Sequence, residues 1–582
     1  MRRTSVYRLL RLRVWLAERF RSGDTPSTYF WAGLVGLVGG ASGPGFRWVC
    51  SELQYLLVGN RLNLVDAAND LPDWRRLLVP AVGGLLAGIV LMLGARLWKG
   101  LRATDYMEAV ALEDGEMRAR PALVRIGSSI FSIASGGSLG REGAMVQLAA
   151  LLGSSLGRIA RMPRPRLRLM IACGAAAGIA SAYNAPIGGA LFVAEIVLGS
   201  IAMESFGPLL FASFMATVIT HTLSGGSPLY EMRAFELVSA QELVAYLGLG
   251  LLAGVCAPGF LWMLESSTRL FARLPMPLWA RMALGGLIVG AISLQHPYVW
   301  GNGQGALLQI LGSDWVWSSL LVLLLLKLAA TAATIGSGAV GGVFTPTLLV
   351  GAVIGGVVGN LVHGFAPEST GAPHFYALVG AGAFLAATTH APLMAILIMF
   401  DMTLAHEIVL PLMLACVGAY VVSQSLRSSS IYAVPRRVRH EDPPVRETLA
   451  TKTVAELLRP DPPRISDTAR FSEILDAFVG RRHNNLYVVD AQGVFQGVIP
   501  LHEIKGMLND PELHRITIAH DFLREEFPRV EPHTTLAVAL QLFTTHPIER
   551  LPVVDAAGQL LGSITKTDLL LALAGVSARP GA

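Results

Sequence analysis

The sequence predicts an all-α protein with many membrane spans, followed by a smaller soluble α/β part. Of the 582 residues, 53% are hydrophobic and 15% are charged, whereas soluble domains average about 25% charged residues. An ordinary soluble composition is confined to residues 449–582, which hold 13 Lys and Arg against 16 Asp and Glu. The preceding 448 residues carry the apolar excess and 53 of the 61 glycines. The chain therefore divides into a membrane part and a soluble part.

The basic character of the chain is concentrated at its amino end. The first 21 residues contain seven arginines and one glutamate, a local net charge of +6 against +5 for the whole chain. We interpret residues 1–29 as a cytoplasmic segment that follows the positive-inside rule, rather than as a lipid- or nucleic-acid-binding arm. Further arginines in 158–168 and 436–439 favour the same side, which predicts an inner or plasma membrane protein with cytoplasmic ends.

The membrane part, residues 30–435, contains apolar stretches that do not fit simple spans. A helix crosses a bilayer with about 20 apolar residues, yet Leu328–Pro367 runs for 40 residues without Asp, Glu, Lys or Arg and includes the glycine-rich run 336–342. Irregular backbone is tolerated in a bilayer only where protein or water covers it. Broken, re-entrant helices are therefore expected, as in a transporter or channel.

An internal repeat organises this part. Gly140–Ala144 aligns with Gly342–Pro346, 202 residues further on. At an offset of 206, Asn184-Ala185-Pro186 falls on His390-Ala391-Pro392, and Glu195 falls on Asp401. Two halves, about 30–225 and 240–430, are implied. By analogy with transporters built from broken helices, we expect the halves to be inverted and the substrate site to lie between them near the midplane.

Both repeated motifs place a glycine-rich turn directly before an apolar helix. The helices are expected over about 141–156 and 343–358. A helix N-terminus carries about half a positive charge and several unpaired N–H groups, and glycine lets a ligand approach them closely. Two such ends meeting in the membrane would form an anion site without a full positive charge.

Glu142 is the most informative residue of the first motif. A carboxylate in an apolar membrane segment is costly and is by default functional. At the first turn of its helix it is favoured by the dipole, so it could occupy the anion site as a tethered substitute and leave on protonation or displacement. The alternative is a helix-capping glutamate paired with Arg141.

These motifs resemble the CLC chloride channels and transporters over roughly residues 30–435. The resemblance rests on Gly140-Arg141-Glu142-Gly143 and on Gly342–Pro346 within the repeat. It implies about 18 helices of unequal length, a homodimer with one pore per subunit, and Glu142 as the gating glutamate. The implied chloride-binding residues are Gly140, Arg141, Gly143, Val343, Phe344 and the pore tyrosine Tyr432.

Two departures bear on mechanism. The family's serine-containing turn is replaced by Ala103–Glu108, where Thr104 keeps a hydroxyl and is either a chloride ligand or a plain loop or capping residue. The inner glutamate of the proton-coupled exchangers aligns with Ile196, and the preceding Glu195 is the remaining candidate for a proton path. Ile cannot relay protons, so a gated channel is favoured over a chloride/proton antiporter.

The other polar residues of this part, namely Asp401, His221, His390 and Lys327, are interpreted as capping, packing or solvent-edge groups.

The soluble part follows a linker, 436–451, and repeats with a period of 65. Leu486–Asp490 matches Leu551–Asp555, and each copy is expected to run helix, strand, strand, helix. The copies, 452–510 and 516–576, resemble a tandem pair of CBS domains, some of which bind adenine nucleotides. The family's ribose-binding signature is kept by Thr565 and Asp568, whereas the first copy reads Pro500–Glu503 without the hydroxyl. One nucleotide site at most is suggested, against a structural or dimerising role.

The function predicted is anion transport, with chloride ions and membrane lipid as partners. The sequence shows no Walker loop, nucleophile triad or metal cluster, so we expect neither an enzyme nor a required cofactor. An alternative of another class, a membrane-anchored nucleotide sensor with vestigial transport, is opposed by the intact motifs around Glu142 and Phe344.

Overall fold

The computed structural model describes residues 25–61, 63–97, 105–111, 117–226, 229–230, 237–313, 315–432, 449, 451–480, 485–505, 517–546 and 548–573. The chain separates into two compact units, residues 1–434 and 435–582. Thr104, the basic amino-terminal segment up to residue 24 and the basic residues 436–439 lie outside the described residues.

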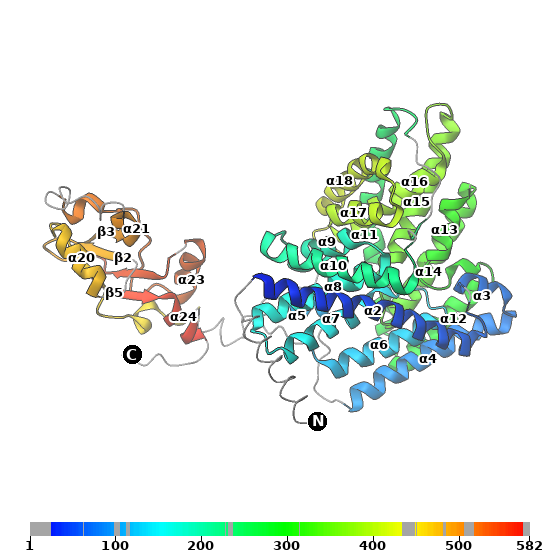
Figure 1. The fold of residues 1–582 in the computed structure, drawn as a ribbon, viewed down its shortest axis with the longest axis horizontal. Coiled ribbons are helices and arrows are strands. Elements are labelled where there is room, and N and C mark those ends of the chain that lie inside the picture. Colours follow the sequence, from blue (N-terminus) through cyan, green and yellow to red (C-terminus); the bar gives the residue numbers. More distant parts are fainter. Residues whose placement is uncertain are drawn as a thin grey trace, which may run out of the picture. The chain divides into compact units, whose positions relative to one another are not determined.

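The first unit is built from helices of very unequal length (Figure 1). The first half comprises α2 (Thr25–Val58), α3 (Leu64–Asp70), α4 (Asp73–Leu97), α5 (Tyr106–Ala111), α6 (Ala119–Ala134), α7 (Glu142–Ile159), α8 (Arg164–Tyr183), α9 (Pro186–Leu191), the π-helix η1 (Phe192–Leu198) and α10 (Met203–Ser224). The second half comprises α11 (Glu242–Ala272), α12 (Leu278–Ser293), η2 (Pro297–Val299), α13 (Gln304–Gly312), α14 (Trp317–Gly336), α15 (Phe344–Phe365), α16 (Pro373–Thr389), α17 (Pro392–Thr403), η3 (His406–Ile408) and α18 (Val409–Leu426).

Six stretches of the described chain are long and apolar enough to cross a membrane, and several others are shorter. Among the shorter ones, α9 with η1 spans Pro186–Leu198 and α17 spans Pro392–Thr403. The expected broken helices are therefore present. The helix expected from about 141 begins at Glu142, and the one expected from about 343 begins at Phe344.

The repeat is visible in how the helices pack. Within the first half α7 packs on α8 and α2 on α10, and within the second half α15 packs on α16 and α11 on α18. Between the halves, α4 packs on α12 and α9 on α17. Asn184 and His390, paired by the 206-residue offset, end α8 and α16 in the same left-handed conformation, with φ values of 58° and 57°.

Two carboxylates show that the two halves contact each other reciprocally. Glu195 accepts hydrogen bonds from the backbone amides of Leu393 and Met394 at the start of α17, at 3.4 and 2.7 Å. Asp401 accepts from Ile187 and Gly188 at the start of α9, both at 2.9 Å. Each half thus caps the broken helix of the other, which is the reciprocity that a two-fold axis requires. The expectation that Asp401 is a capping residue agrees with this geometry.

Much of the glycine excess serves close helix crossings. A Cβ added to Gly286 on α12 would lie 2.1 Å from the carbonyl oxygen of Pro80 on α4, and one added to Gly355 on α15 would lie 2.0 Å from that of Tyr376 on α16. These contacts bring backbones together as small residues do in membrane helix packing. The glycines therefore have a second use besides the turns before α7 and α15.

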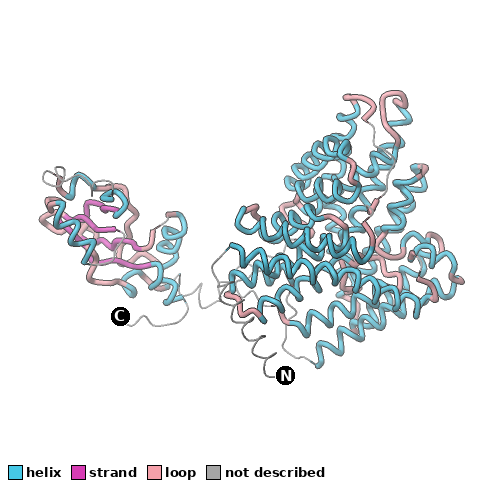
Figure 2. The backbone as a smooth tube through the Cα atoms, in the orientation of Figure 1, coloured by secondary structure: helices cyan, strands magenta, loops and turns pink. Residues whose placement is uncertain are grey.

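The second unit contains two copies of one motif (Figure 2). The first copy holds α20 (Phe471–Gly480), β2 (Asn485–Val489), β3 (Phe495–Pro500) and α21 (Leu501–Lys505), and the second holds α23 (Leu536–Thr545), β4 (Arg550–Val554), β5 (Leu560–Thr565) and α24 (Lys566–Leu573). β2 pairs antiparallel with β3 and parallel with β1 (Arg464–Ser466), while β4 pairs antiparallel with β5. The predicted helix–strand–strand–helix order is confirmed in both copies.

The two copies exchange their leading segments. Val454, in η4 (Val454–Leu457) ahead of the first copy, is buried in the core that also contains Leu551 and Ile564 of the second. Phe522, in η5 (Ala519–Phe522) ahead of the second copy, is buried in the core of the first. This exchange joins the copies into one body.

Candidate functional site

The N-termini of α7 and α15 meet inside the first unit. The amide of Gly140 donates to the carbonyl of Gly342 at 2.6 Å, and the amide of Gly342 donates to the carbonyl of Gly140 at 2.8 Å. These two residues are equivalent under the 202-residue repeat, and their bridge is antiparallel. The expectation that the two helix ends come together is therefore confirmed.

The carboxylate of Glu142 lies over this bridge and is 3% exposed. Its Oε1 accepts a hydrogen bond from Asn302 Nδ2 at 3.1 Å and another from the hydroxyl of Thr345. Its Oε2 has no partner among the described residues. A Cβ added to Gly140 would lie 1.8 Å from Oε2, and one added to Gly342 would lie 3.1 Å from it. Glycine at both positions leaves room for the carboxylate.

The hydrogen bond from Thr345 extends to α8. The Thr345 hydroxyl also lies 3.1 Å from the hydroxyl of Tyr183. Since Thr345 has one proton, which it donates to Glu142, Tyr183 is the donor of the second bond. Arg141 and Glu142 form no ion pair among the described residues, and the Arg141 guanidinium donates to Gln304 Oε1 at 2.9 Å.

A cavity of about 230 Å³, here the first cavity, opens on one side of the carboxylate. Glu142, Gly143, Val343, Phe344 and Tyr432 all line it. These are five of the residues that the motifs and the resemblance singled out, and the structure brings them together although more than 280 positions separate the ends of the set. Gly140 does not line this cavity, and Arg141 lines the second cavity described below.

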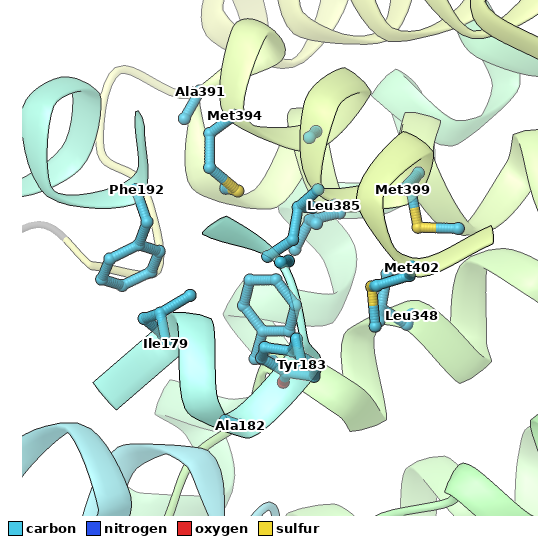
Figure 3. Close-up of a cluster of buried hydrophobic side chains, with 14 of the residues drawn as sticks. Ile179, Ala182, Tyr183, Phe192, Leu348, Leu385, Ala391, Met394, Met399 and Met402 are labelled. Carbon is cyan, nitrogen blue, oxygen red and sulfur yellow. The ribbon is translucent and has the colours of Figure 1, made fainter. Parts of the chain in front are cut away.

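Aromatic rings close the wall of the first cavity. Phe192 packs edge-on against Tyr432 with ring centroids 5.4 Å apart, and Tyr183 lies 4.8 Å from Phe344. Figure 3 shows the apolar layer around them, to which α8 contributes Ile179 and Tyr183 and α17 contributes Met394, Met399 and Met402.

The first cavity also has polar lining that the sequence reasoning missed. Asp105, Arg125, Ser129 and Gln147 all face it, and Gln147 Oε1 accepts from the amide of Tyr106 at 3.1 Å. The available signal was the spacing of four between Arg125 and Ser129, which places both on one face of α6. Thr104 itself lies outside the described residues, next to Asp105.

A second cavity, of about 390 Å³, lies on the other side of the α7 start. Arg47, Arg61, Arg141, Asn302 and Gln304 are among its lining residues. Arg61 is paired with Glu52 at 2.7 Å, whereas Arg47 and Arg141 form no ion pair among the residues described. Glu142 faces the first cavity while its partner Asn302 lines the second, so the carboxylate stands between the two.

Comparison with known proteins agrees with this geometry. The model of the family described as voltage gated chloride channel matches residues 83–424, and the CBS domain model matches 454–510 and 519–575. This chain belongs to the CLC family. Its described part contains no cluster of His, Cys, Asp and Glu that could hold a metal ion.

Several relatives of this CLC protein are bacterial. It is 50% identical over 406 residues to a ClcB-like protein of Ralstonia nicotianae, covering 69% of this chain and 95% of the relative. It is 41% identical over 406 residues to the voltage-gated ClC-type chloride channel ClcB of Citrobacter koseri and to that of Salmonella typhimurium, covering 97% of each. Nearly the whole of each relative is thus matched by about two thirds of this chain.

Solved structures share the fold. A slow cyanobacterial Cl⁻/H⁺ antiporter is 28% identical, with a TM-score of 0.62 over 71% of this chain and 97% of that one. A eukaryotic CLC transporter is 18% identical, with a TM-score of 0.60 over 93% of this chain and 97% of that one, and supports the fold alone.

In the CBS unit, the candidate nucleotide residues are already engaged with each other and with an arginine. Asp568 accepts from Arg459 Nε and Nη2 at 2.8 and 2.6 Å and from the Thr565 hydroxyl at 2.6 Å. Burial works against the charged form of Asp568, but the bonds from Arg459 and Thr565 outweigh it and hold its pKa below the ordinary value. One period away, Arg524 donates to Glu503 at 2.5 Å. Both copies therefore place an arginine on this carboxylate, which in the second copy is the predicted ribose ligand Asp568.

Proposed function

We propose that this CLC protein carries chloride through a pathway that the side chain of Glu142 closes, without obligatory proton exchange. The observation that carries the proposal is the position of the buried carboxylate between two cavities, at the point where the N-termini of α7 and α15 meet.

The local chemistry explains how such a gate would work. The ionised carboxylate is held by donors from Asn302 and Thr345 and by the positive ends of two helices. Protonation removes the charge that these donors hold, so the side chain can leave. Chloride then takes the vacated place on backbone N–H groups, which bind it weakly enough to let it pass on.

The residues at positions 195 and 196 support conduction without coupling. Ile196 occupies the position of the family's inner glutamate, and the carboxylate of Glu195 is bound to the first amides of α17. Proton-coupled exchange is the second candidate, because the similar cyanobacterial protein of known structure is a Cl⁻/H⁺ antiporter.

The assembly proposed is the homodimer implied by family resemblance, with both cavities formed within one subunit. Arginines in 158–168 support a cytoplasmic side for the ends of α7 and α8 that flank this segment, and the arginines in 436–439 support the same side for the CBS unit that follows them. The CBS pair is proposed as a regulatory body.

The test is chloride flux and reversal potential in proteoliposomes under opposed chloride and proton gradients. Uncoupled conduction predicts a reversal potential at the chloride equilibrium value, whereas exchange predicts a shift with the pH gradient. Glu142→Ala should retain flux and lose its pH dependence. Absence of any anion flux would refute both candidates, and an unchanged pH profile in Glu142→Ala would refute the gating role.

A further inference from the structure

A buried lysine lies behind the loop that holds Glu142. Lys327, in the middle of α14, is 1% exposed, so it does not lie at a solvent edge. Its ammonium donates hydrogen bonds to the backbone carbonyls of Val299 at 2.9 Å and Gly301 at 2.8 Å. It forms no ion pair within the described part of the chain. An ionisable amine buried in a membrane protein is costly and marks a functional position by default.

The loop that Lys327 holds, residues 299–304, is docked on the turn leading to Glu142. The amide of Gly301 donates to the carbonyl of Gly136 at 3.2 Å. The ring of Trp300 covers Gly136 so closely that a Cβ there would lie 2.6 Å from it. Gly301 and Gly303 turn the loop with φ values of 67° and 95°, in the region that favours glycine.

This loop delivers two side chains to the start of α7. Asn302 donates to Glu142 at 3.1 Å, and Gln304 accepts from Arg141 at 2.9 Å. The orientation of Asn302 is fixed, because its Oδ1 accepts from the amide of Gln304 at 3.1 Å. Its Nδ2 is therefore the atom that faces Glu142. A shift of the 299–304 loop would move this donor directly.

We propose that Lys327 is a positioning residue of the gate, which holds the 299–304 loop so that Asn302 clamps Glu142 in the closed position. The inference rests on the proposed gating role of Glu142. Lys327 lines neither the first nor the second cavity. It therefore acts through Val299, Gly301 and Asn302 rather than by binding the transported anion.

The pH readout of this proposal depends on the groups that surround Glu142. Beside it on the chain is Arg141, and three tyrosines lie within electrostatic reach. The tyrosines are Tyr183, Tyr230 and Tyr432. Asp105 and Arg125 face the first cavity, and Arg47 of α2 faces the second. None of them contacts Lys327 through a described hydrogen bond, so a change at position 327 leaves them in place.

The experiment measures chloride efflux from proteoliposomes of phosphatidylethanolamine and phosphatidylglycerol at symmetric pH values between 4.5 and 8. Full-length wild type is compared with Lys327→Met, Lys327→Arg and both lysine variants combined with Glu142→Ala. Loss of the clamp weakens the ionised, closed state, so Lys327→Met should open at higher pH. We expect its midpoint to rise by about one unit, a tenfold change in the closed-to-open ratio. Lys327→Arg keeps the charge and the donors and should stay near wild type.

Controls separate a positioning role from general loss of packing. Leu323→Ala removes a fully buried side chain from the same helix and should lower the melting temperature without moving the midpoint. In the Glu142→Ala background, Lys327→Met should have no effect on the pH profile. If Lys327→Met does not assemble, Lys327→Gln replaces it in the experiment. The glutamine side chain is shorter and cannot reach both carbonyls, so this variant should shift the midpoint in the same direction.

The outcomes distinguish the two proposals. An unchanged midpoint in Lys327→Met or Lys327→Gln, with pH dependence lost in Glu142→Ala, overturns the role of Lys327 and leaves the gate intact. A shift that persists in the Glu142→Ala background also overturns it. pH dependence that survives in Glu142→Ala with wild-type Lys327 overturns the proposed function itself.

Discussion

Asn302 donates a 3.1 Å hydrogen bond to the carboxylate of Glu142, although the two residues belong to different halves of the membrane unit. Together with the hydroxyl of Thr345, this amide is a donor that holds the Glu142 carboxylate in the position described here. Both donors come from the second half, whereas Glu142, the proposed gate, belongs to the first. The proposed closed state would thus depend on the contact between the repeats.

Removing either donor should open the pathway at higher pH. A hydrogen bond to a charged group contributes about 1.5–3 kcal/mol, so Asn302→Leu or Thr345→Val should raise the pH midpoint of chloride efflux by about one to two units. Asn360→Leu is the matched control, since Asn360 donates to backbone carbonyls away from the gate. A midpoint at the wild-type value in both variants would contradict the clamp.

Gly140→Ala should displace the carboxylate of Glu142 by steric overlap. The added Cβ would lie 1.8 Å from Oε2, closer than two non-bonded atoms can approach. We expect higher efflux at neutral pH and a flattened pH profile. The control is Gly45→Ala on α2, where a Cβ meets nothing within 4 Å. Retention of the full pH dependence in Gly140→Ala would show that the closed position of Glu142 is different.

Glu195→Gln should reduce stability without changing ion coupling. Glu195 caps α17 as Asp401 caps α9, and a charge at a helix N-terminus contributes about 0.3–2 kcal/mol. Glu195→Gln and Asp401→Asn should therefore lower the melting temperature by similar amounts. The proton-to-chloride ratio, measured by simultaneous pH and chloride electrodes, should stay at the wild-type value. A ratio that falls only in Glu195→Gln would assign Glu195 to a proton path instead.

Asp568→Asn should loosen the second CBS copy in a pH-dependent way. Because the folded-state pKa of Asp568 lies below its unfolded value of about 3.9, its stabilisation is complete at neutral pH and is lost as the pH falls through the folded pKa. Amide hydrogen exchange in β4 and β5 should be faster than wild type at pH 7. The two proteins should converge as the pH falls through the folded-state pKa of Asp568. A difference that is independent of pH would contradict the ion-pair explanation.

Arg459→Ala should expose the candidate nucleotide site. The bidentate pair with Asp568 competes with a ribose for the same carboxylate. We expect saturating AMP or ATP to raise the melting temperature of the Arg459→Ala variant more than that of wild type. The double variant Arg459→Ala with Asp568→Ala should lose this increase. Equal nucleotide stabilisation of wild type and of both variants would place the ligand elsewhere.

The membrane character, the repeat and the central residue were accessible from the sequence. Charge scarcity and long apolar stretches predict spans, because a bilayer excludes charge regardless of helix arrangement. The 202-residue offset paired Gly140 with Gly342, and these two residues form the backbone bridge. Such signals are local in the chain or periodic along it, so they can be recognised from the sequence alone.

The partners of Glu142 were not accessible in the same way. Asn302 and Lys327 lie 160 and 185 residues beyond it and belong to no repeated motif. Arg141 was considered as an alternative partner of Glu142, but it donates to Gln304. The predicted ribose site around Asp568 contains an arginine from 109 residues earlier in the chain. Pairings at this distance depend on how helices and copies pack, which residue type and spacing do not encode.

The sequence by itself determined that this chain is a membrane protein with a repeated, glycine-led anion motif, one conspicuous glutamate and a CBS pair. The tertiary structure decided which groups hold that glutamate, that Glu195 and Asp401 cap each other's broken helices, and that many glycines serve helix crossings. The physical reason is that composition and periodicity determine whether a segment lies in the bilayer or in water and which local backbone it forms. Buried polar groups, in contrast, form hydrogen bonds with whichever segments the packing brings within reach.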